Sequence, residues 1–451
     1  MNNSYWWKSL PLWQPLPPLA ESIDVDIAIV GAGYTGLWSA YFLHKAQPNL
    51  QIAIIEAEHV GFGASGRNGG WVSSFWPTPI KSIAKKHGPE IAIDFQRYLH
   101  KLVDEFGQEI SVAGIDADFN KAGTVNLARS AAQKHRLLAE LVEYHSFGFT
   151  SADYDFTFDL SKLPAATNVQ GGLTSPNCAT IHPAKLVRGL AEKVLSQGTK
   201  IFENSRVNEV SSNQLKVNGK NIYAKYILIA TEGYRHELIP RATAPIHSLM
   251  FISDPIPEEL LDELRVKPGL TFNDARNLII YGQRTAENRI AFGGRGAPYR
   301  LGSKTGTNVE MYQPAFSYLK SALGEMFPPL VEYLNQPSHT WGGPIGVARD
   351  WQPSIWIDRK SGTISAGNYV GDGVAASFLA GQTVADLITE QKTKRISFPW
   401  VQHRSPKWEV EPTRYFLINA ARTAIELSDR LEAKMGSQSM VSKLLWRILK
   451  R

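Results

Sequence analysis

The stretch that decides the fold is Val25-Asp26-Ile27-Ala28-Ile29-Val30-Gly31-Ala32-Gly33-Tyr34-Thr35-Gly36. The residues before the first glycine form a short apolar run of strand character, and the residues from Leu37 onward follow a helical spacing. A second apolar run ends on Glu56, about twenty residues after the last glycine of the motif. Strand, GxGxxG turn, helix, strand and acid in this order predict a Rossmann-like dinucleotide-binding unit.

The three glycines of this motif have separate physical tasks. One permits the tight turn, one permits close approach of the backbone to a pyrophosphate, and one permits close contact between helix and strand. The phosphates then lie at the helix N-terminus, where unpaired N–H groups and the helix dipole favour negative charge. The acid at position 56 favours an unphosphorylated ribose, so FAD or NAD is expected rather than NADP. The predicted cofactor-binding residues of this segment are Gly31, Gly33, Tyr34, Thr35, Gly36 and Glu56.

The composition of the 451-residue chain is that of an ordinary globular protein, with 43% hydrophobic and 20% charged residues. This length predicts two or three domains. The net charge of +6 suits an anionic cofactor, but it is too mild to predict binding to nucleic acid. Cys178 is the only cysteine, which excludes an internal disulfide and a cysteine-based metal cage, and we predict no metal site.

The termini bear on where the protein acts. No apolar run approaches the roughly 18 residues that a membrane span needs. The N-terminus also lacks the basic-then-apolar pattern of a signal peptide, so a cytoplasmic protein is expected. Residues 439–451 carry an apolar stripe with basic residues opposite, a pattern that suits peripheral contact with an anionic membrane surface. An ordinary docked helix is the favoured alternative for this segment.

A second glycine cluster follows at residues 61–70, with the sequence Gly-Phe-Gly-Ala-Ser-Gly-Arg-Asn-Gly-Gly. Its backbone carries little side-chain bulk, which suits close approach to a flat ring and its phosphates. The arginine adds a fixed positive charge, and the serine and asparagine add hydrogen-bonding groups. A plain flexible loop explains this pattern poorly so soon after a nucleotide-binding unit. The predicted cofactor-binding residues here are Gly63, Ser65, Arg67, Asn68, Gly69 and Gly70.

These two motifs, Gly33-Tyr34-Thr35-Gly36-Leu37 and residues 61–70, resemble those of the D-amino-acid-oxidase-type (DAO) FAD-dependent oxidoreductases. Within that superfamily the chain is most similar to the gamma-glutamylputrescine oxidase branch. The resemblance implies FAD held in a Rossmann-like domain, with a smaller mixed-sheet domain covering the isoalloxazine ring and the substrate. It also implies that Val207 contacts the adenine through its backbone and that Thr231 lies near the pyrophosphate.

A third glycine-rich segment, residues 366–374, precedes another helical pattern. A glycine-rich turn that leads into a helix N-terminus suits an anion or a ring oxygen. The resemblance implies that this helix points at the flavin, with Gly371, Gly373 and Val374 as contacts. Asp372 stands where the family commonly has histidine, and a carboxylate there would oppose negative charge on the reduced ring. We therefore take Asp372 as a catalytic candidate.

Arg284 is the second catalytic candidate. It lies in one of two strand-like segments, 278–284 and 289–295, that flank a polar turn and predict a hairpin. An arginine near a flavin could bind a substrate carboxylate or favour the anionic reduced ring. Arg289 and Arg295 remain alternatives, because the spacing does not separate the three arginines. Arg284 is favoured because its Tyr-x-x-Arg surroundings resemble the same branch.

The predicted fold class is α/β in the first domain and mixed α+β in the second. The FAD-binding domain is discontinuous and comprises residues 24–88, 165–235 and 341–392. Residues 89–164 and 236–340 form the substrate domain, and residues 393–451 form a C-terminal helical extension.

Two further segments carry expectations. Residues 1–23 contain four prolines, so the segment is expected to run extended, with its tryptophans lying along the folded body. A partner-binding arm is the alternative. His182 precedes a proline that opens a predicted helix, and the resemblance marks this place as the re-entry into the FAD domain rather than as a catalytic site.

We therefore predict an FAD-dependent amine oxidoreductase. Its substrate would be a small amine or amino acid, including acylated polyamines, that transfers a hydride to the flavin, with molecular oxygen as acceptor. FAD is expected to be bound non-covalently, because no cysteine lies near Gly346 and no histidine lies between Val60 and Lys86. The alternatives are a membrane-associated dehydrogenase that passes electrons to a quinone or carrier, and a flavin-binding interaction protein without turnover. NAD in place of FAD is disfavoured, because the second and third glycine-rich segments would then have no role.

Overall fold

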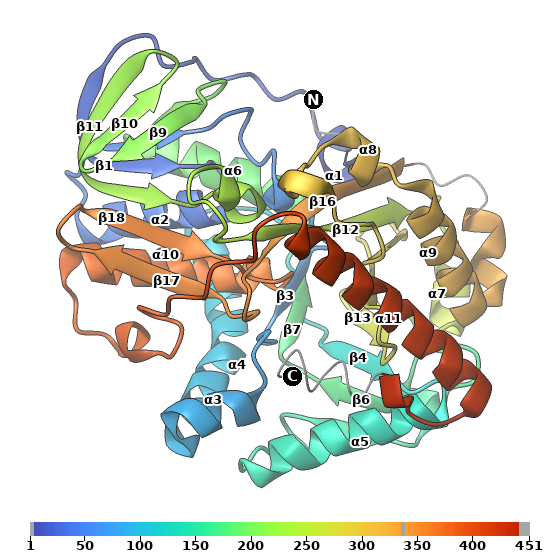
Figure 1. The fold of residues 1–451 in the computed structure, drawn as a ribbon. Helices are drawn as coiled ribbons and strands as arrows, with labels where there is room; N and C mark the ends of the chain where they lie inside the picture. Colours follow the sequence, from blue (N-terminus) through green and yellow to red (C-terminus); the bar gives the residue numbers. More distant parts are fainter. Residues whose placement is uncertain (1–3, 335–338, 442–451) are drawn as a thin grey trace.

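A computed structural model describes residues 4–334 and 339–441 of the chain (Figure 1). It contains two large sheets, each with its own helices, and a C-terminal helix that lies beside the second sheet. The mixed α/β character agrees with the predicted fold class.

The first sheet is built around the nucleotide-binding motif. Its strands run in the order β17(Ser354–Asp358), β18(Thr363–Gly367), β11(Lys220–Ile229), β1(Ile23–Val30), β2(Ile52–Ile55) and β8(Lys200–Phe202), and β10(Gln214–Val217) and β9(Val207–Ser211) extend it from β11. Strand β1 pairs in parallel with both β2 and β11, so their carboxyl ends meet at one edge. The two-residue turn Asn218-Gly219 joins β10 to β11 in antiparallel pairing.

Helices α2(Tyr34–Ala46), α6(Pro183–Ser196) and α10(Gly373–Thr389) belong to this first domain. Helices α2 and α10 pack closely at Gly381 of α10, because glycine has no side chain there. A Cβ at this position would lie 2.6 Å from the Cβ of Trp38 on α2. Helix α6 begins where predicted, and His182 caps it by accepting a hydrogen bond at Nδ1 from the Lys185 amide (3.2 Å). This gives His182 a structural role.

The second sheet runs in the order β16(His339–Val347), β12(Ala244–Ile252), β15(Ile290–Gly294), β14(Ile280–Arg284), β13(Thr271–Asp274), β4(Thr124–Leu127), β6(Gly172–Ser175) and β5(Asp155–Thr157). Strands β14 and β15 form the predicted hairpin. A separate two-stranded sheet pairs β3(Trp71–Ser73) with β7(Cys178–Thr180). One face of the second sheet is covered by α9(Gln313–Met326), whose apolar residues share a core with β12, β14 and β15.

Three predicted domain boundaries differ from this arrangement. Residues 165–235 were expected in the first domain, but β6 pairs with β4 in the second sheet. Strand β16 was also expected there, but it pairs with β12 along its whole length. Helix α4(Pro89–Val112) was expected in the substrate domain, but its apolar face joins the core of the first domain. Periodicity along the chain does not reveal which sheet a strand joins or which core a helix covers.

The N-terminal arm departs from its prediction in one place. The arm was expected to be extended throughout, but Tyr5–Lys8 form one helical turn, α1. The first proline comes later, at Pro11, so nothing in this stretch prevents the turn from closing. Trp6 is buried to 1% exposure, which stabilises the turn against the body of the protein. Beyond it the arm has no regular structure as far as β1.

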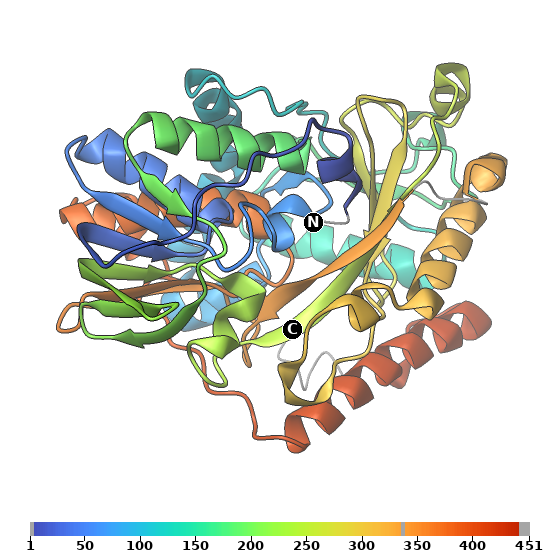
Figure 2. The ribbon, with the colours of Figure 1, turned by 90° about the horizontal axis from the view of Figure 1, so that it is seen from above.

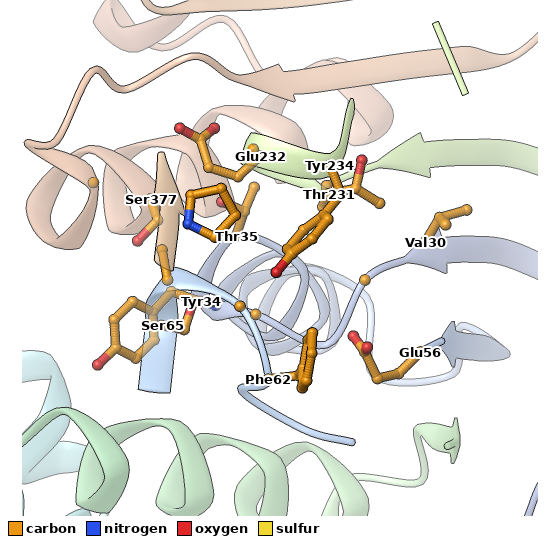
Figure 3. Close-up of a pocket in the computed structure, with 18 of the residues that line it drawn as sticks. Val30, Tyr34, Thr35, Glu56, Phe62, Ser65, Thr231, Glu232, Tyr234 and Ser377 are labelled. Atoms are coloured by element: carbon orange, nitrogen blue, oxygen red, sulfur yellow. Dashed lines mark hydrogen bonds between the residues drawn. The ribbon is translucent and has the colours of Figure 1, made fainter. Parts of the chain in front are cut away.

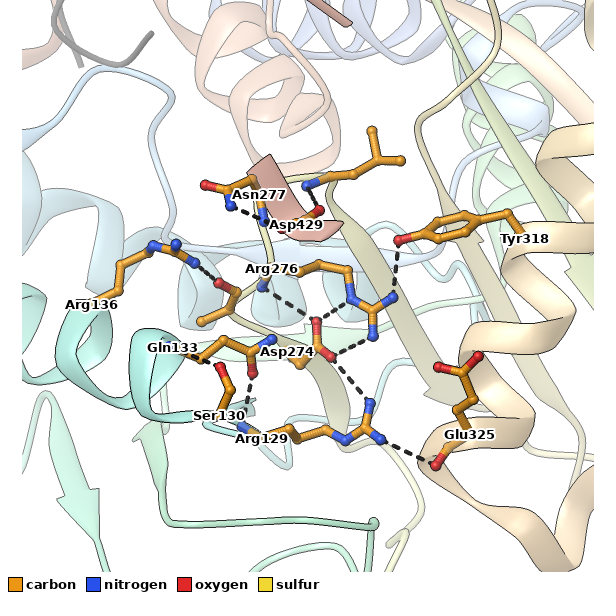
Figure 4. Close-up of polar contacts among 12 residues, drawn as sticks. Arg129, Ser130, Gln133, Arg136, Asp274, Arg276, Asn277, Tyr318, Glu325 and Asp429 are labelled. Atoms are coloured by element: carbon orange, nitrogen blue, oxygen red, sulfur yellow. Dashed lines mark hydrogen bonds and ion pairs between the residues drawn. The ribbon is translucent and has the colours of Figure 1, made fainter. Parts of the chain in front are cut away.

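The C-terminal extension contains a long helix, α11(Thr413–Met435), which docks through polar groups (Figure 4). The Asp429 carboxylate accepts hydrogen bonds from the backbone amides of Asn277 (2.7 Å) and Leu278 (2.8 Å). Glu432 pairs with Arg136 of α5(Ala131–Ser146) at 2.8 Å. Most of the predicted membrane-binding stripe, residues 442–451, lies outside the described residues. Among the described helices, none is both long enough and apolar enough to cross a bilayer.

Candidate active site

A deep cavity opens at the carboxyl ends of β1, β2 and β11 and extends toward β16 (Figure 3). Its unfilled space is about 1240 Å³, including the part open to solvent. All three glycine-rich segments contribute to its lining, so the cavity suits a large, elongated molecule. The predicted residues that line it are Gly31, Gly33, Tyr34, Thr35, Glu56, Gly63, Ser65, Asn68, Val207, Thr231, Gly371, Gly373 and Val374.

The first glycine motif has the geometry that its sequence predicts. Gly31 adopts φ +107°, and a Cβ there would lie 2.8 Å from the Ala230 carbonyl oxygen. Gly36 does not line the cavity; a Cβ there would collide with the Gly31 carbonyl oxygen, because helix α2 and strand β1 touch at this point. Gly33 precedes the first residue of α2, so the helix N-terminus opens into the cavity.

Glu56 lies at the carboxyl end of β2, where an acceptor for ribose hydroxyls is expected. Its carboxylate accepts hydrogen bonds from the amides of Ala32 (2.8 Å) and Glu58 (3.0 Å), which fix its position. Burial raises the pKa of Glu56 to about 7, while these hydrogen bonds act in the opposite direction. A bound ribose would add hydroxyl donors to the same carboxylate.

The second glycine cluster divides between two tasks. Ser65 ties the cluster to the first motif, because its Oγ accepts a hydrogen bond from the Tyr34 amide at the start of α2 (2.8 Å). Gly69 and Gly70 face the second sheet instead of the cavity. A Cβ at Gly69 would lie 2.6 Å from the Tyr281 ring, and one at Gly70 would collide with Gln283.

Arg67 was predicted to bind the cofactor, but it does not line the cavity. Its guanidinium pairs with Glu310 at 2.9 Å, donates to the Gly342 carbonyl (3.1 Å) and lies over the Phe62 ring at 4.6 Å. Both side chains of the ion pair are largely buried, at 7% and 14% exposure. Arg67 therefore joins the glycine cluster to α8(Thr307–Glu310) and β16 in the described structure.

The third glycine segment is held by a residue that the sequence analysis did not identify. The Glu232 carboxylate accepts hydrogen bonds from the amides of Asn368 (2.7 Å), Tyr369 (3.1 Å) and Gly346 (3.1 Å). Glu232 lines the cavity, and burial raises its pKa to about 7. A charged residue three positions after the end of the apolar strand β11 was the signal that could have identified it.

Further cavity residues were missed as well. The Tyr369 hydroxyl is 2.9 Å from Thr35 Oγ1, which joins the third glycine segment to the first. Phe62 and Tyr234 also line the cavity, and the centroids of their rings are 6.2 Å apart. Isolated aromatic residues have no sequence pattern that separates a ligand contact from a core contact.

The two catalytic candidates fare differently. Arg284 lies away from the cavity, with its guanidinium bonded to Asp262 (3.0 Å), Asn288 (2.8 Å) and the Val266 carbonyl (3.1 Å). This buried network is structural, so the geometry does not support the predicted catalytic role. Strands β14 and β15 pair Arg284 with Ile290 near the turn, whereas the cavity lies at the open end of the hairpin.

Arg295, left as an alternative, lies at that open end. Its Nη2 donates to the Val370 carbonyl at 2.5 Å, beside Gly371 of the cavity wall. Burial lowers the pKa of Arg295, and the negative charge of Asp372 opposes this effect. Arg295 and the predicted candidate Asp372 are therefore near enough to interact electrostatically.

Two aromatic side chains stand near this pair. The Tyr281 hydroxyl is 2.8 Å from Ser248 Oγ, and its ring lies 6.0 Å from the Trp71 ring. Tyr281 also touches the space beside Gly69, so this region adjoins the second glycine cluster. The partly buried Arg295 and Asp372 therefore lie near aromatic side chains at this end of the cavity.

The cavity fits FAD on structural grounds that are independent of any motif. Thr231 Oγ1 is buried and has no hydrogen-bond partner among the described residues, as expected for a group that awaits a ligand. The three glycine segments converge on one elongated space with a helix N-terminus along it. Cys178 is buried in β7 and does not line the cavity, so FAD is held without a cysteine link. No cluster of potential metal ligands occurs in the described part of the chain.

Comparisons with known proteins agree with this geometry. Residues 26–387 match the sequence profile of the family described as DAO, FAD dependent oxidoreductase. The chain is 26% identical over 413 residues to gamma-glutamylputrescine oxidoreductase of Escherichia coli (strain K12), covering 89% of this chain and 92% of that protein.

Solved structures share the fold. The chain superposes on glycine oxidase from Geobacillus kaustophilus with a TM-score of 0.68 at 19% identity, covering 84% of this chain and 99% of that one. It superposes on L-proline dehydrogenase from P. horikoshii with a TM-score of 0.66 at 18% identity, covering 85% and 96%. An oxidase and a dehydrogenase thus share this architecture, so the fold alone does not select the electron acceptor.

Proposed function

Because the chain belongs to the DAO family of FAD-dependent oxidoreductases, we propose that it oxidises a small amine or amino acid, with molecular oxygen as the acceptor. The similarity to gamma-glutamylputrescine oxidoreductase makes acylated polyamines the first substrate class to test. The observation that carries the proposal is the position of Arg295, which donates to Val370 of the third glycine segment and interacts electrostatically with Asp372, at one end of a cavity that fits FAD.

The chain's own residues would orient the substrate and exclude water. Asp372 suits an ammonium or amine group, and Arg295 suits a carboxylate or carbonyl oxygen. Tyr281 and Trp71, whose rings contact each other edge to face, would supply apolar surface for the carbon chain. FAD, when bound, accepts the hydride from the carbon that bears the amine. The imine product would then be hydrolysed to an aldehyde or keto product and ammonia or an amine.

The test is an absorbance spectrum of the purified protein, followed by an anaerobic screen for bleaching of the flavin band. Polyamines, acylated polyamines and amino acids are the three substrate sets. Bleaching by one set and recovery in air with release of peroxide are the expected results. A protein that carries flavin but is bleached by no amine would contradict the proposed activity and would support an interaction protein without turnover.

A membrane-associated dehydrogenase is the second candidate, and the surface of α11 favours it. Phe416 (64% exposed), Leu427 (46%) and Met440 (84%) present apolar side chains to solvent along the C-terminal extension. The basic residues Arg430 and Lys434 are exposed on the same extension. Such a surface suits an anionic bilayer that carries a quinone. Co-sedimentation with anionic vesicles, lost on deletion of residues 439–451, together with slow reoxidation in air, would favour this candidate over an oxidase.

A further inference from the structure

Side chains from three distant segments donate hydrogen bonds to the backbone of the second glycine cluster. Four consecutive carbonyl oxygens each accept one hydrogen bond from a side chain. The pairs are Ser4 Oγ to Gly66 O (2.7 Å), Trp341 Nε1 to Arg67 O (2.8 Å), Trp6 Nε1 to Asn68 O (2.9 Å) and Gln283 Nε2 to Gly69 O (2.6 Å). Two of the four donors belong to the N-terminal arm.

This arrangement determines where the amide groups point. In a trans peptide unit the C=O and the N–H point to opposite sides. Because Trp341 holds the Arg67 carbonyl and Trp6 holds the Asn68 carbonyl, the amides of Asn68 and Gly69 are turned to the other side of the chain. Within the described residues these two amides have no protein acceptor. Adjacent free amides of this kind attract electronegative atoms.

The arm runs along the first domain (Figure 2) and is attached to it by hydrogen bonds. Glu203, fully buried, accepts hydrogen bonds from Trp13 Nε1 (2.9 Å) and the Leu16 amide (2.7 Å) of the arm. The same carboxylate accepts a bond from the amide of Val60, the residue before the glycine cluster (2.7 Å). The arm and the cluster therefore share one buried anchor.

We propose that the N-terminal arm is part of the cofactor site: Ser4 and Trp6 are positioning residues that orient the backbone of residues 66–69, so that the amides of Asn68 and Gly69 are available to the flavin. Asn68 lines the cavity, so its amide lies beside the space that a bound cofactor would fill, and the Gly69 amide follows it directly in the chain. The proposal concerns FAD binding and not the identity of the amine. A failed substrate screen therefore leaves it intact.

A simpler account is that the arm only covers apolar surface. The neighbouring tryptophan separates the two accounts. Trp7 packs on His59 (5.1 Å) and Trp13 (6.2 Å), but its Nε1 is buried without a partner among the described residues. A change of Trp7 to Phe removes an indole N–H that donates to nothing, whereas the same change at Trp6 removes the bond to the Asn68 carbonyl.

The experiment compares Trp6→Phe, Ser4→Ala and the control Trp7→Phe in the full-length protein. The first readout is the dissociation constant of FAD, measured by titrating the flavin-free protein. The second is hydrogen exchange of the peptide that covers residues 63–71 in the flavin-free protein, and the third is the flavin midpoint potential in the loaded protein. The unfolding temperature of each flavin-free variant is measured as well, so that a change in any of the three readouts can be compared with the change in stability.

For Trp6→Phe we expect FAD binding about 5- to 10-fold weaker, because one buried carbonyl loses its donor. We also expect faster exchange at residues 63–71 and a lower midpoint potential, because the amides that stabilise charge on the reduced ring are less well oriented. Ser4→Ala should weaken binding about 3-fold. Trp7→Phe should leave FAD binding and exchange at the wild-type values.

Wild-type FAD affinity in Trp6→Phe would overturn the proposal. Equal losses in Trp6→Phe and Trp7→Phe would overturn it too, because packing alone would then explain the effect. If Trp6→Phe does not yield folded protein, Ser4→Ala decides, since it removes one hydroxyl and little packing. Unchanged FAD affinity and unchanged hydrogen exchange in Ser4→Ala would then contradict the proposal that the arm orients the backbone of residues 66–69.

Discussion

The two ends of the cofactor cavity are built in opposite ways. At the phosphate end, Gly31, Gly36 and Glu56 come from one continuous segment, and their contacts are made largely within it. At the flavin-ring end, contacts join residues far apart in sequence, such as Gln283 with Gly69 and Arg295 with Val370. The first end is a local property of the chain, whereas the second exists only when both sheets are assembled.

This difference implies that the two ends tolerate change differently. A defect at the phosphate end breaks the motif itself and should abolish cofactor binding. A defect at the ring end removes one of several supports, so binding should weaken while the chemistry changes. The following predictions, in descending order of expected effect, can break or sharpen this distinction.

The largest effect is expected for Gly36→Ala. The new Cβ would collide with the Gly31 carbonyl oxygen, which is backbone and cannot move aside without shifting α2 from β1. We expect a loss of stability of about 3 kcal/mol or more and protein that purifies without flavin. Gly198→Ala is the control, because Gly198 has φ +97° with open space around it, so it tests backbone strain alone. If Gly36→Ala purifies with bound flavin and has normal thermal stability, the phosphate end does not depend on the local contacts of its own segment.

Glu232→Gln should have the next largest effect. One oxygen becomes an amide NH₂ that cannot accept from a backbone N–H, so at least one of the three bonds is lost. We expect a loss of about 1–3 kcal/mol in stability and weaker FAD binding. Thermal unfolding and flavin titration measure both quantities.

The pH dependence of Glu232→Gln sharpens this prediction. The pKa of Glu232 in the folded protein is about 7, raised from 4.5 by burial. The folded state therefore binds more protons than the unfolded state between these values, and the stability of the flavin-free protein falls as the pH rises through 7. Glu232→Gln removes this contribution and should flatten the fall.

Glu140→Gln is the matched control for Glu232→Gln. Burial also raises the pKa of Glu140 to about 7, but Glu140 lies on α5, away from the cavity. This variant should flatten the pH dependence without weakening FAD binding. A Glu140 variant that loses flavin as readily as the Glu232 variant would remove the distinction between the two sites.

Asp372→Asn tests the ring end through its charge. Removing a carboxylate near the ring should make reduction easier and raise the two-electron midpoint potential by about 30 mV, which corresponds to about 1.4 kcal/mol. Spectroelectrochemistry measures the shift, and Asp24→Asn, at an exposed site on β1, serves as the control. A potential equal to that of the wild type would show that Asp372 does not act on the ring.

The smallest effect is expected for Thr35→Val. This change keeps the shape of the side chain but removes the hydroxyl that meets Tyr369 at 2.9 Å. We expect a loss of about 1 kcal/mol, seen in both unfolding and FAD titration. Thr383→Val, on α10, removes a hydroxyl bonded only within its own helix and is the control. Identical FAD affinity in the Thr35 and Thr383 variants would argue against a link between the first and third glycine segments.

The difference between the phosphate end and the flavin-ring end also separates what could be predicted from the sequence from what could not. Residues 24–56 were interpretable from the sequence because each glycine and the acid have a task that is set by neighbours in the chain. The hairpin of β14 and β15 was also predicted, but not which of its ends meets the cavity. That choice separates Arg284 from Arg295, and only the packing of the two sheets decides it. The contacts of Glu232 and Trp6 were not predicted for the same reason, since their partners are backbone groups with no sequence signature, although the position of Glu232 after an apolar strand was visible in the sequence.

The attachment of helix α11 has an evolutionary consequence. The match to the family profile ends at residue 387, before the helix begins. One of its attachments, Asp429, binds backbone amides at residues 277 and 278, which any amino acid other than proline would provide. Contact with backbone amides places few constraints on the side chains of the surface to which α11 binds. A lineage could thus acquire, exchange or discard such an appendage largely through mutations in the appendage itself, while the catalytic body remains under its own selection.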